Sequence, residues 1–201
     1  MNISWYGANC VRVEAKEGSV LVEPFDPKGT GLRGPVIKDD VVLLSAYEQP
    51  PSVLERVNED ALLVRGPGEY EKKGIAVRGV QAYQDSQKGK ELGLATVYNV
   101  IADEISVCVL GALGQESLTD EQREAIGDPD VLVVPSSAQG ALDAKAAAAL
   151  ATAMEPKVII ALGASDSFVK QVGLPAQKVD AVRLQKKTLP ADQTALYVIN
   201  A

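Results

Sequence analysis

The chain of 201 residues contains no histidine, so the commonest general base and the commonest nitrogen ligand of zinc are both absent. Its two cysteines, Cys10 and Cys108, stand far apart and form no Cys-x-x-Cys pair. Ser-His-Asp and Cys-His catalysis are therefore excluded, because each needs an imidazole to take a proton from the nucleophile. A Ser-Lys mechanism, a carboxylate mechanism and a cation held by oxygen ligands stay open.

Three serines follow apolar, strand-like runs, at Ser45, Ser136 and Ser137. Each is a formal candidate for a nucleophile, but serine is also common in turns and caps, and we favour that structural interpretation. Cys10 is a candidate reactive thiol only if a cation such as Arg78 stabilises its thiolate. We expect both cysteines to be buried and reduced.

Three carboxylates, Glu48, Asp85 and Glu116, have the ligand chemistry for Mg²⁺ or Ca²⁺. Their spacing matches no known cation loop, so we interpret them as a solvated rim. Gly66-Pro67-Gly68 lacks the glycine spacing and the following helix of a phosphate loop, and we expect a structural turn over 66–70.

The charge and the apolar runs of the sequence limit the classes of partner that we expect. The net charge is −7, and the basic pairs Lys72-Lys73 and Lys186-Lys187 are isolated, so we expect no nucleic-acid binding. No apolar run has the length of a membrane span, and no signal-peptide pattern precedes Ile3. We expect a cytoplasmic protein that does not bind membranes, with residues 1–201 forming a single domain.

Short strands dominate the pattern, and helices come between blocks of strands. That order favours two packed sheets with helices outside, an α/β (α+β) fold, over a doubly wound sheet. The predicted strands are 10–14, 19–22, 41–44, 61–64, 74–81, 96–101, 105–110, 131–134, 158–162, 181–184 and 195–199. The predicted helices are 52–59, 119–127 with a capping box, 143–154 with Asp143 as N-cap, and one from Asp166.

Several short sequences occur in an order and spacing typical of one family. They are Trp5–Cys10, Val22–Phe25, Gly66–Tyr70, Gly74, Val77–Gly79, Leu110–Gln115, Val134-Pro135 and Asp143–Ala148. From Ile3 to about Gly163 the chain resembles the metallo-β-lactamase superfamily, in the branch similar to ascorbate-phosphate lactonases. The resemblance implies a four-layer αββα sandwich and descent from metal-dependent hydrolases.

The family's metal motif, Ser-His-x-His-x-Asp-His, gathers ligands for two ions about 4 Å apart. Here the same stretch reads Ser45-Ala46-Tyr47-Glu48-Gln49-Pro50-Pro51, and the two prolines also alter the backbone. The vestigial metal positions are Ala46, Glu48, Pro50, Pro51, Ala112 and Gly163, and further histidine positions hold Ala8, Gln84 and Gln115. The resemblance therefore implies a degenerate member with no metal and no cofactor.

Two classes of function follow. The first is a pseudoenzyme that acts as a scaffold, an oligomer subunit or a ligand-binding module, with no catalytic residue. Its residual pocket would contain Ser45, Tyr47, Asp85 and Gln115. The partners left open are a second copy of the chain, another protein and a small ligand.

The alternative is a hydrolase of the same superfamily with a non-zinc or atypical active site. Glu69, Tyr70 and Arg78 keep it open, because they stand unaltered in the matching segments. The pseudoenzyme is the favoured prediction.

Overall fold

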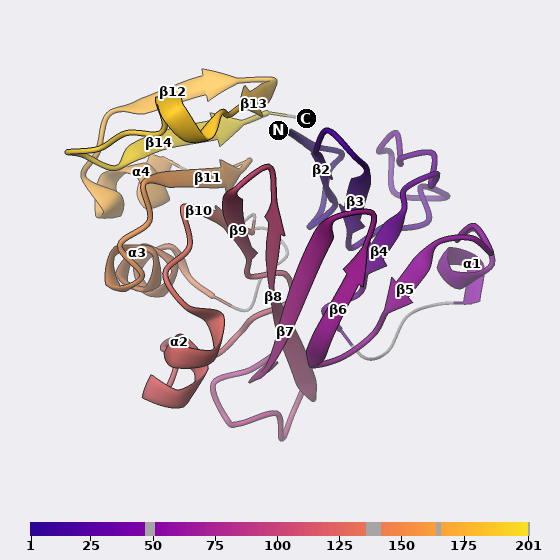
Figure 1. The fold of residues 1–201 in the computed structure, drawn as a ribbon. Coiled ribbons are helices and arrows are strands. Elements are labelled where there is room, and N and C mark those ends of the chain that lie inside the picture. The colour runs from indigo at the N-terminus through magenta and orange to yellow at the C-terminus, as the bar shows by residue number, and fades with distance from the viewer. Residues whose placement is uncertain (47–50, 136–141, 164–165, 201) are drawn as a thin grey trace.

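The computed structural model describes residues 1–46, 51–135, 142–163 and 166–200. Within them, two β-sheets pack against each other (Figure 1). The six-stranded sheet has the order β13 (Ala181–Arg183), β1 (Asn2–Trp5), β2 (Val11–Glu14), β3 (Ser19–Val22), β4 (Val41–Leu43) and β5 (Leu62–Val64). The eight-stranded sheet has the order β12 (Ala176–Val179), β14 (Ala195–Ile199), β11 (Val158–Leu162), β10 (Val131–Val134), β9 (Ile105–Val109), β8 (Leu94–Ala102), β7 (Ile75–Tyr83) and β6 (Gly68–Lys72).

The main core lies between the two sheets. Successive side chains of a strand point to opposite faces, so Val11 and Val13 of β2, with Val20 and Val22 of β3, enter this core together. In the parallel part of the larger sheet, β10 and β11 are buried at every residue. This confirms the prediction that the continuous apolar runs are strands covered on both faces.

Three helices cover the outer face of the eight-stranded sheet (Figure 1): α2 (Asp120–Ile126), α3 (Ala144–Ala153) and α4 (Asp166–Val172). The predicted capping box at Thr119 is present, and Asp143 caps α3 by accepting the Ala146 amide at 2.7 Å. No helix in the described ranges is long and apolar enough to cross a membrane.

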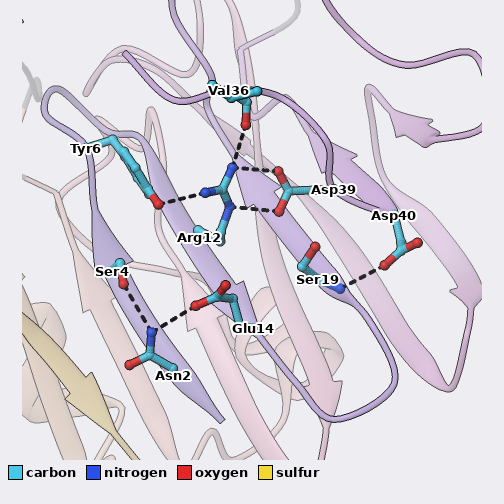
Figure 2. A network of polar contacts seen from close by, with 9 residues as sticks. All are labelled: Asn2, Ser4, Tyr6, Arg12, Glu14, Ser19, Val36, Asp39 and Asp40. Carbon is cyan, nitrogen blue, oxygen red and sulfur yellow. Dashed lines mark hydrogen bonds and ion pairs between the residues drawn. The ribbon is translucent and has the colours of Figure 1, made fainter. Parts of the chain in front are cut away.

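The outer face of the six-stranded sheet is buried too, although little helix covers it. Arg12, Leu21 and Val42 alternate with the core residues of their strands and are at most 8 % exposed. Arg12 donates hydrogen bonds to the carbonyl of Val36 and to Asp39, both in the segment before β4 (Figure 2). Loop 24–40 and the single turn α1 (Pro51–Leu54) lie on this face. The two packed sheets confirm the predicted fold class.

Two local predictions are wrong, and strand β12 was not predicted. The helix expected over 52–59 ends at Leu54. The turn expected over 66–70 becomes strand from Gly68, because Glu69 pairs with Arg78 across the β6–β7 hairpin. Strand β12 has no alternating apolar pattern, and it forms because it extends the sheet beside β14.

Candidate functional site

Three of the positions that the resemblance matches to metal ligands follow the carboxyl ends of strands. Ala46 comes after β4, Ala112 after β9 and Gly163 after β11. In sheets with parallel strands this end is the usual place for a ligand crevice. Ala46 forms a bridge with Ala95 of β8, and the Ala112 amide bonds to Ser45 beside Ala46. The tertiary structure therefore brings the ends of β4 and β9 together, as the resemblance implies.

Ser45 is the junction between these strand ends. Its hydroxyl oxygen accepts the Ala112 amide at 2.8 Å, and its carbonyl accepts the amide of Thr96 at 2.8 Å. Its own amide donates to the carboxylate of Glu23. Ser45 is only 1 % exposed, and a β-carbon at Gly111 would overlap its side chain. The serine therefore links both sheets and lies outside the reach of a substrate in this conformation.

Two polar residues at this junction were missed as site residues in the sequence. Glu23 adopts a φ of 50° directly after β3, which aims its carboxylate at Ser45. Asn9 donates to the Gly111 carbonyl at 3.5 Å, and within the described residues its buried side-chain oxygen has no hydrogen-bond partner. Both lie inside segments that match the family, which was the available signal.

Gly163 lies under an aromatic side chain. A β-carbon there would lie 2.5 Å from Cη2 of Trp5, and the φ of Gly163 is 54°. The indole nitrogen of Trp5 donates to the carbonyl of Ala8 at 2.8 Å, which fixes the ring. The resemblance matches both Ala8 and Gly163 to family histidines, and one tryptophan contacts both residues.

Asp85 organises its own loop. Its two carboxylate oxygens accept the amides of Gln87, Gly89, Glu91 and Leu92 at 2.7–3.1 Å. These hydrogen bonds, that of Leu92 first, hold the pKa of Asp85 below its ordinary value. Neighbouring Gln84 donates to the carbonyls of Leu92 and Leu94, so both side chains brace residues 84–94.

Gln115 connects neighbouring elements through the hydrogen bonds of its side chain. Its amide oxygen accepts the Tyr83 amide at 3.1 Å, and its nitrogen donates to Ser117 and to the side chain of Gln122. Gln122 is part of the capping box of α2, so Gln115 ties that helix to the end of β7.

The structure thus places Ser45 at the strand junction, whereas Asp85 bonds to amides of its own loop and Gln115 bonds to the end of β7 and to α2. Glu116 is exposed. Five candidates lie outside the described residues: Tyr47, Glu48, Pro50, Ser136 and Ser137. Pro51 begins α1. The predicted residual pocket remains a prediction.

The two thiols are unreactive by environment. Cys10 and Cys108 are fully buried and unpaired. Burial raises the pKa of the Cys10 thiol far above its ordinary value and that of Cys108 to about 12. Because the thiolate is the nucleophile and metal ligand, neither cysteine is prepared for chemistry.

The segment Gly66–Gly68 holds the turn into β6. The Tyr70 hydroxyl donates to the Pro67 carbonyl at 3.1 Å, and a β-carbon at Gly79 would lie 2.8 Å from the Gly66 carbonyl. This close approach explains Gly79, and Gly68 has a φ of 142° with Tyr70 3.0 Å from its β-carbon position, so neither glycine requires a phosphate.

A dinuclear zinc centre needs several donor side chains close together. Within the described ranges, no three His, Cys, Asp or Glu side chains lie close enough together to hold a metal ion. Ala112 offers a methyl group and Gly163 has no space for a side chain. The residues described at the strand ends therefore do not fit such a centre.

Comparisons with known proteins indicate the same fold as the two packed sheets. Residues 2–162 match the beta-lactamase superfamily domain. A structure from Thermotoga maritima, described as a Zn-dependent hydrolase of the metallo-β-lactamase superfamily, is 26 % identical with a TM-score of 0.79, over 98 % of both chains. The metallo-β-lactamase fold protein YhfI from Bacillus subtilis is 10 % identical with a TM-score of 0.60, over 98 % of this chain and 95 % of that one.

A third similar structure is a protein from Parabacteroides distasonis described as a metal-dependent hydrolase. It is 14 % identical with a TM-score of 0.61, over 85 % of this chain and 86 % of that one. At these low identities, the Bacillus and Parabacteroides structures indicate the fold alone. No curated protein matches the chain.

Proposed function

Because the chain belongs to the metallo-β-lactamase superfamily, we propose that it is a pseudoenzyme of that superfamily: a metal-free, cytoplasmic protein that acts as a scaffold, an oligomer subunit or a ligand-binding module. Its ancestry would lie in the branch similar to ascorbate-phosphate lactonases. The observation that carries the proposal is the contact of Trp5 with Gly163, because it leaves no space for a side chain at a metal-ligand position.

Direct hydrogen bonds between protein groups join the ends of three strands. The Ser45 hydroxyl accepts the Ala112 amide, and the Glu23 carboxylate accepts the Ser45 amide, so β3, β4 and β9 are connected without an ion. Hydrogen bonds between buried polar groups can fix the geometry of a site that a metal would otherwise hold. This arrangement supports a structural use of the old cleft.

Metal analysis of the purified protein tests the proposal. The chain is expressed without chelator, incubated with Zn²⁺, Mn²⁺ or Fe²⁺, desalted and analysed for metal, with the Thermotoga maritima relative as the positive control. We expect negligible metal per chain and no rise in Tm, since an ion that bound only the native state would stabilise it. About one ion per chain, with a matching rise in Tm, would overturn the proposal.

Trp5 gives an independent readout of the same site, because it is the only tryptophan in the chain. An ion or ligand at the strand ends would change the surroundings of the indole and hence its emission. We expect no change on titration with Zn²⁺ or Co²⁺. A saturable change that disappears in Glu23→Gln would place a cation at the strand junction and contradict the metal-free proposal.

A hydrolase with a non-zinc active site is the second candidate, favoured by the 26 % identity to the Thermotoga protein over 98 % of both chains. Glu69 and Arg78 form an ion pair at 3.0 Å, and Arg78 also donates to Ala125 of α2. These contacts brace β6 and β7 against α2. Hydrolysis of phosphodiester, lactone or ester substrates that is lost in Glu69→Gln, while the variant stays folded, would favour this candidate over the pseudoenzyme.

A further inference from the structure

A pocket with no assigned role opens between the ends of α3 and α4, on the outer side of the eight-stranded sheet. It has a volume of about 500 Å³, within the range of small-molecule sites. Ala151, Pro156 and Ile159 are buried and line it, and the half-buried Val172 and Leu174 line it from the α4 side. We call this cavity the α3–α4 pocket.

The sequence of α3 explains the hollow. The helix packs on the sheet mainly through small side chains, and Ala151 is fully buried although it contributes only a methyl group. A larger residue at this point would fill the space that faces Val172 of α4. The apolar residues of the lining favour an apolar molecule, because its transfer from water is favourable. The uncharged polar residues Thr152, Gln193 and Thr194 complete the lining.

Charge at the rim defines the rest of the ligand. Of the residues that line the α3–α4 pocket, all in the described part of the chain, Glu155 alone is charged. It follows the C-cap residue of α3, where the helix dipole adds partial negative charge. Glu155 also adopts a φ of 46°, a conformation usually left to glycine after a helix. A carboxylate beside a helix C-terminus complements a cation.

We propose that the α3–α4 pocket binds a small apolar molecule that carries one cationic group, with the apolar part against Ala151, Ile159 and Leu174 and the cation at Glu155. An aliphatic primary ammonium has this chemistry. The pocket lies apart from the Ser45 junction, so this inference does not depend on the proposed function.

The test compares two probes of similar size, n-hexylammonium and the neutral n-hexanol, titrated into the whole chain and followed by backbone amide NMR. We expect saturable shifts at Ala151, Ile159 and Leu174, with tighter binding of the ammonium. Glu155→Gln should weaken binding of the ammonium by about fivefold, the effect of one exposed ion pair, and leave binding of hexanol unchanged. Val172→Trp should abolish binding of both probes, because the indole would fill the pocket.

Glu124→Gln is the matched control, since Glu124 is an exposed carboxylate on α2 and should not affect either probe. Each variant is first checked for an unchanged Tm. The proposal is wrong if Glu155→Gln leaves ammonium binding intact, if the two probes bind alike, or if the shifts map to another surface. Shifts that depend on protein concentration alone would instead assign the pocket to a second copy of the chain and overturn the small-molecule proposal.

Discussion

The indole ring of Trp5 covers the backbone of Gly163, with Cη2 only 2.5 Å from the point where a β-carbon would stand. The two residues come from different sheets, Trp5 from the end of β1 and Gly163 from the end of β11. Their contact joins the end of β1 to the end of β11. It also makes the stability of the fold sensitive to any side chain at residue 163.

Gly163→Ala should therefore destabilise the protein strongly. The substitution adds a positive-φ penalty and an overlap with Trp5, which together lower the free energy of unfolding by about 3 kcal/mol. Gly173→Ala is the matched control, because Gly173 has a φ of 72° with nothing within 4 Å of its β-carbon position. It should cost about 1 kcal/mol. Urea denaturation measures both, and equal losses would show that Trp5 does not exclude a side chain.

A double-mutant cycle isolates the contact itself. Trp5→Leu shortens the side chain that meets residue 163, so it should harm the Gly163→Ala background less than the wild type. We expect a coupling energy of about 1 kcal/mol or more. Additive effects would mean that the loss in Gly163→Ala comes from the backbone conformation alone.

Ser45→Ala tests the junction between β4 and β9. The substitution leaves the Ala112 amide without its acceptor, and we expect a loss of about 2 kcal/mol in the free energy of unfolding. Ser117→Ala, at an exposed serine, should change it by less than about 0.5 kcal/mol. If both variants retain wild-type stability, the Ser45 hydroxyl is dispensable and the idea that it replaces a metal crosslink fails.

The buried ion pair of Arg12 and Asp39 anchors loop 24–40 (Figure 2). Two hydrogen bonds of 2.8 and 2.9 Å join the guanidinium to the carboxylate, and a third of 2.6 Å reaches the Tyr6 hydroxyl. Because the Asp39 side chain is 1 % exposed, Arg12→Met leaves a buried carboxylate without its ion-pair partner. We expect a loss of about 4 kcal/mol in the free energy of unfolding. Thermal or urea unfolding reports it.

Arg123→Met is the comparison for that variant, since the Arg123–Asp120 pair is exposed on α2 and should contribute less than about 1 kcal/mol. The double variant Arg12→Met with Asp39→Leu should recover part of the loss, because no charge then stays buried. A double variant no better than Arg12→Met would assign the loss to the contacts with Tyr6 and Val36.

Asp130 should give stability a pH dependence in the acid range. Burial acts to raise its pKa, but hydrogen bonds from Lys157 and Lys186, at 2.8 and 2.7 Å, outweigh it and hold the pKa below its ordinary value. A carboxylate with a depressed pKa contributes stability above its unfolded pKa of about 4. That contribution is lost as the pH falls through the folded pKa.

Asp130→Asn should accordingly lower the free energy of unfolding by about 2 kcal/mol at neutral pH and flatten its decline in acid, so that variant and wild type converge at low pH. Urea unfolding over a pH series measures this. Asp180→Asn, at an exposed carboxylate, should follow the wild-type curve. A constant difference at all pH values would show that Asp130 acts through packing and not through its charge.

Local patterns in the sequence determined most of the elements. Continuous apolar runs identified β10 and β11, and Thr119 and Asp143 marked the starts of α2 and α3, because capping and burial depend on nearby residues. The absence of histidine likewise follows from the sequence alone. Family resemblance supplied the layer order, which the two sheets confirm.

Only the tertiary structure decided how side chains at the strand ends are used. Ser45 and Ala112 are 67 positions apart, and their hydrogen bond exists because β4 and β9 end at the same edge of the sandwich. Trp5 and Gly163 meet for the same reason, and no local periodicity encodes that contact. From the sequence, Asp85 was interpreted as a solvated carboxylate. In the folded loop its carboxylate accepts backbone amides, and the sequence alone does not show these partners. Contacts between distant segments depend on how the sheets pack, and a linear pattern does not contain that information.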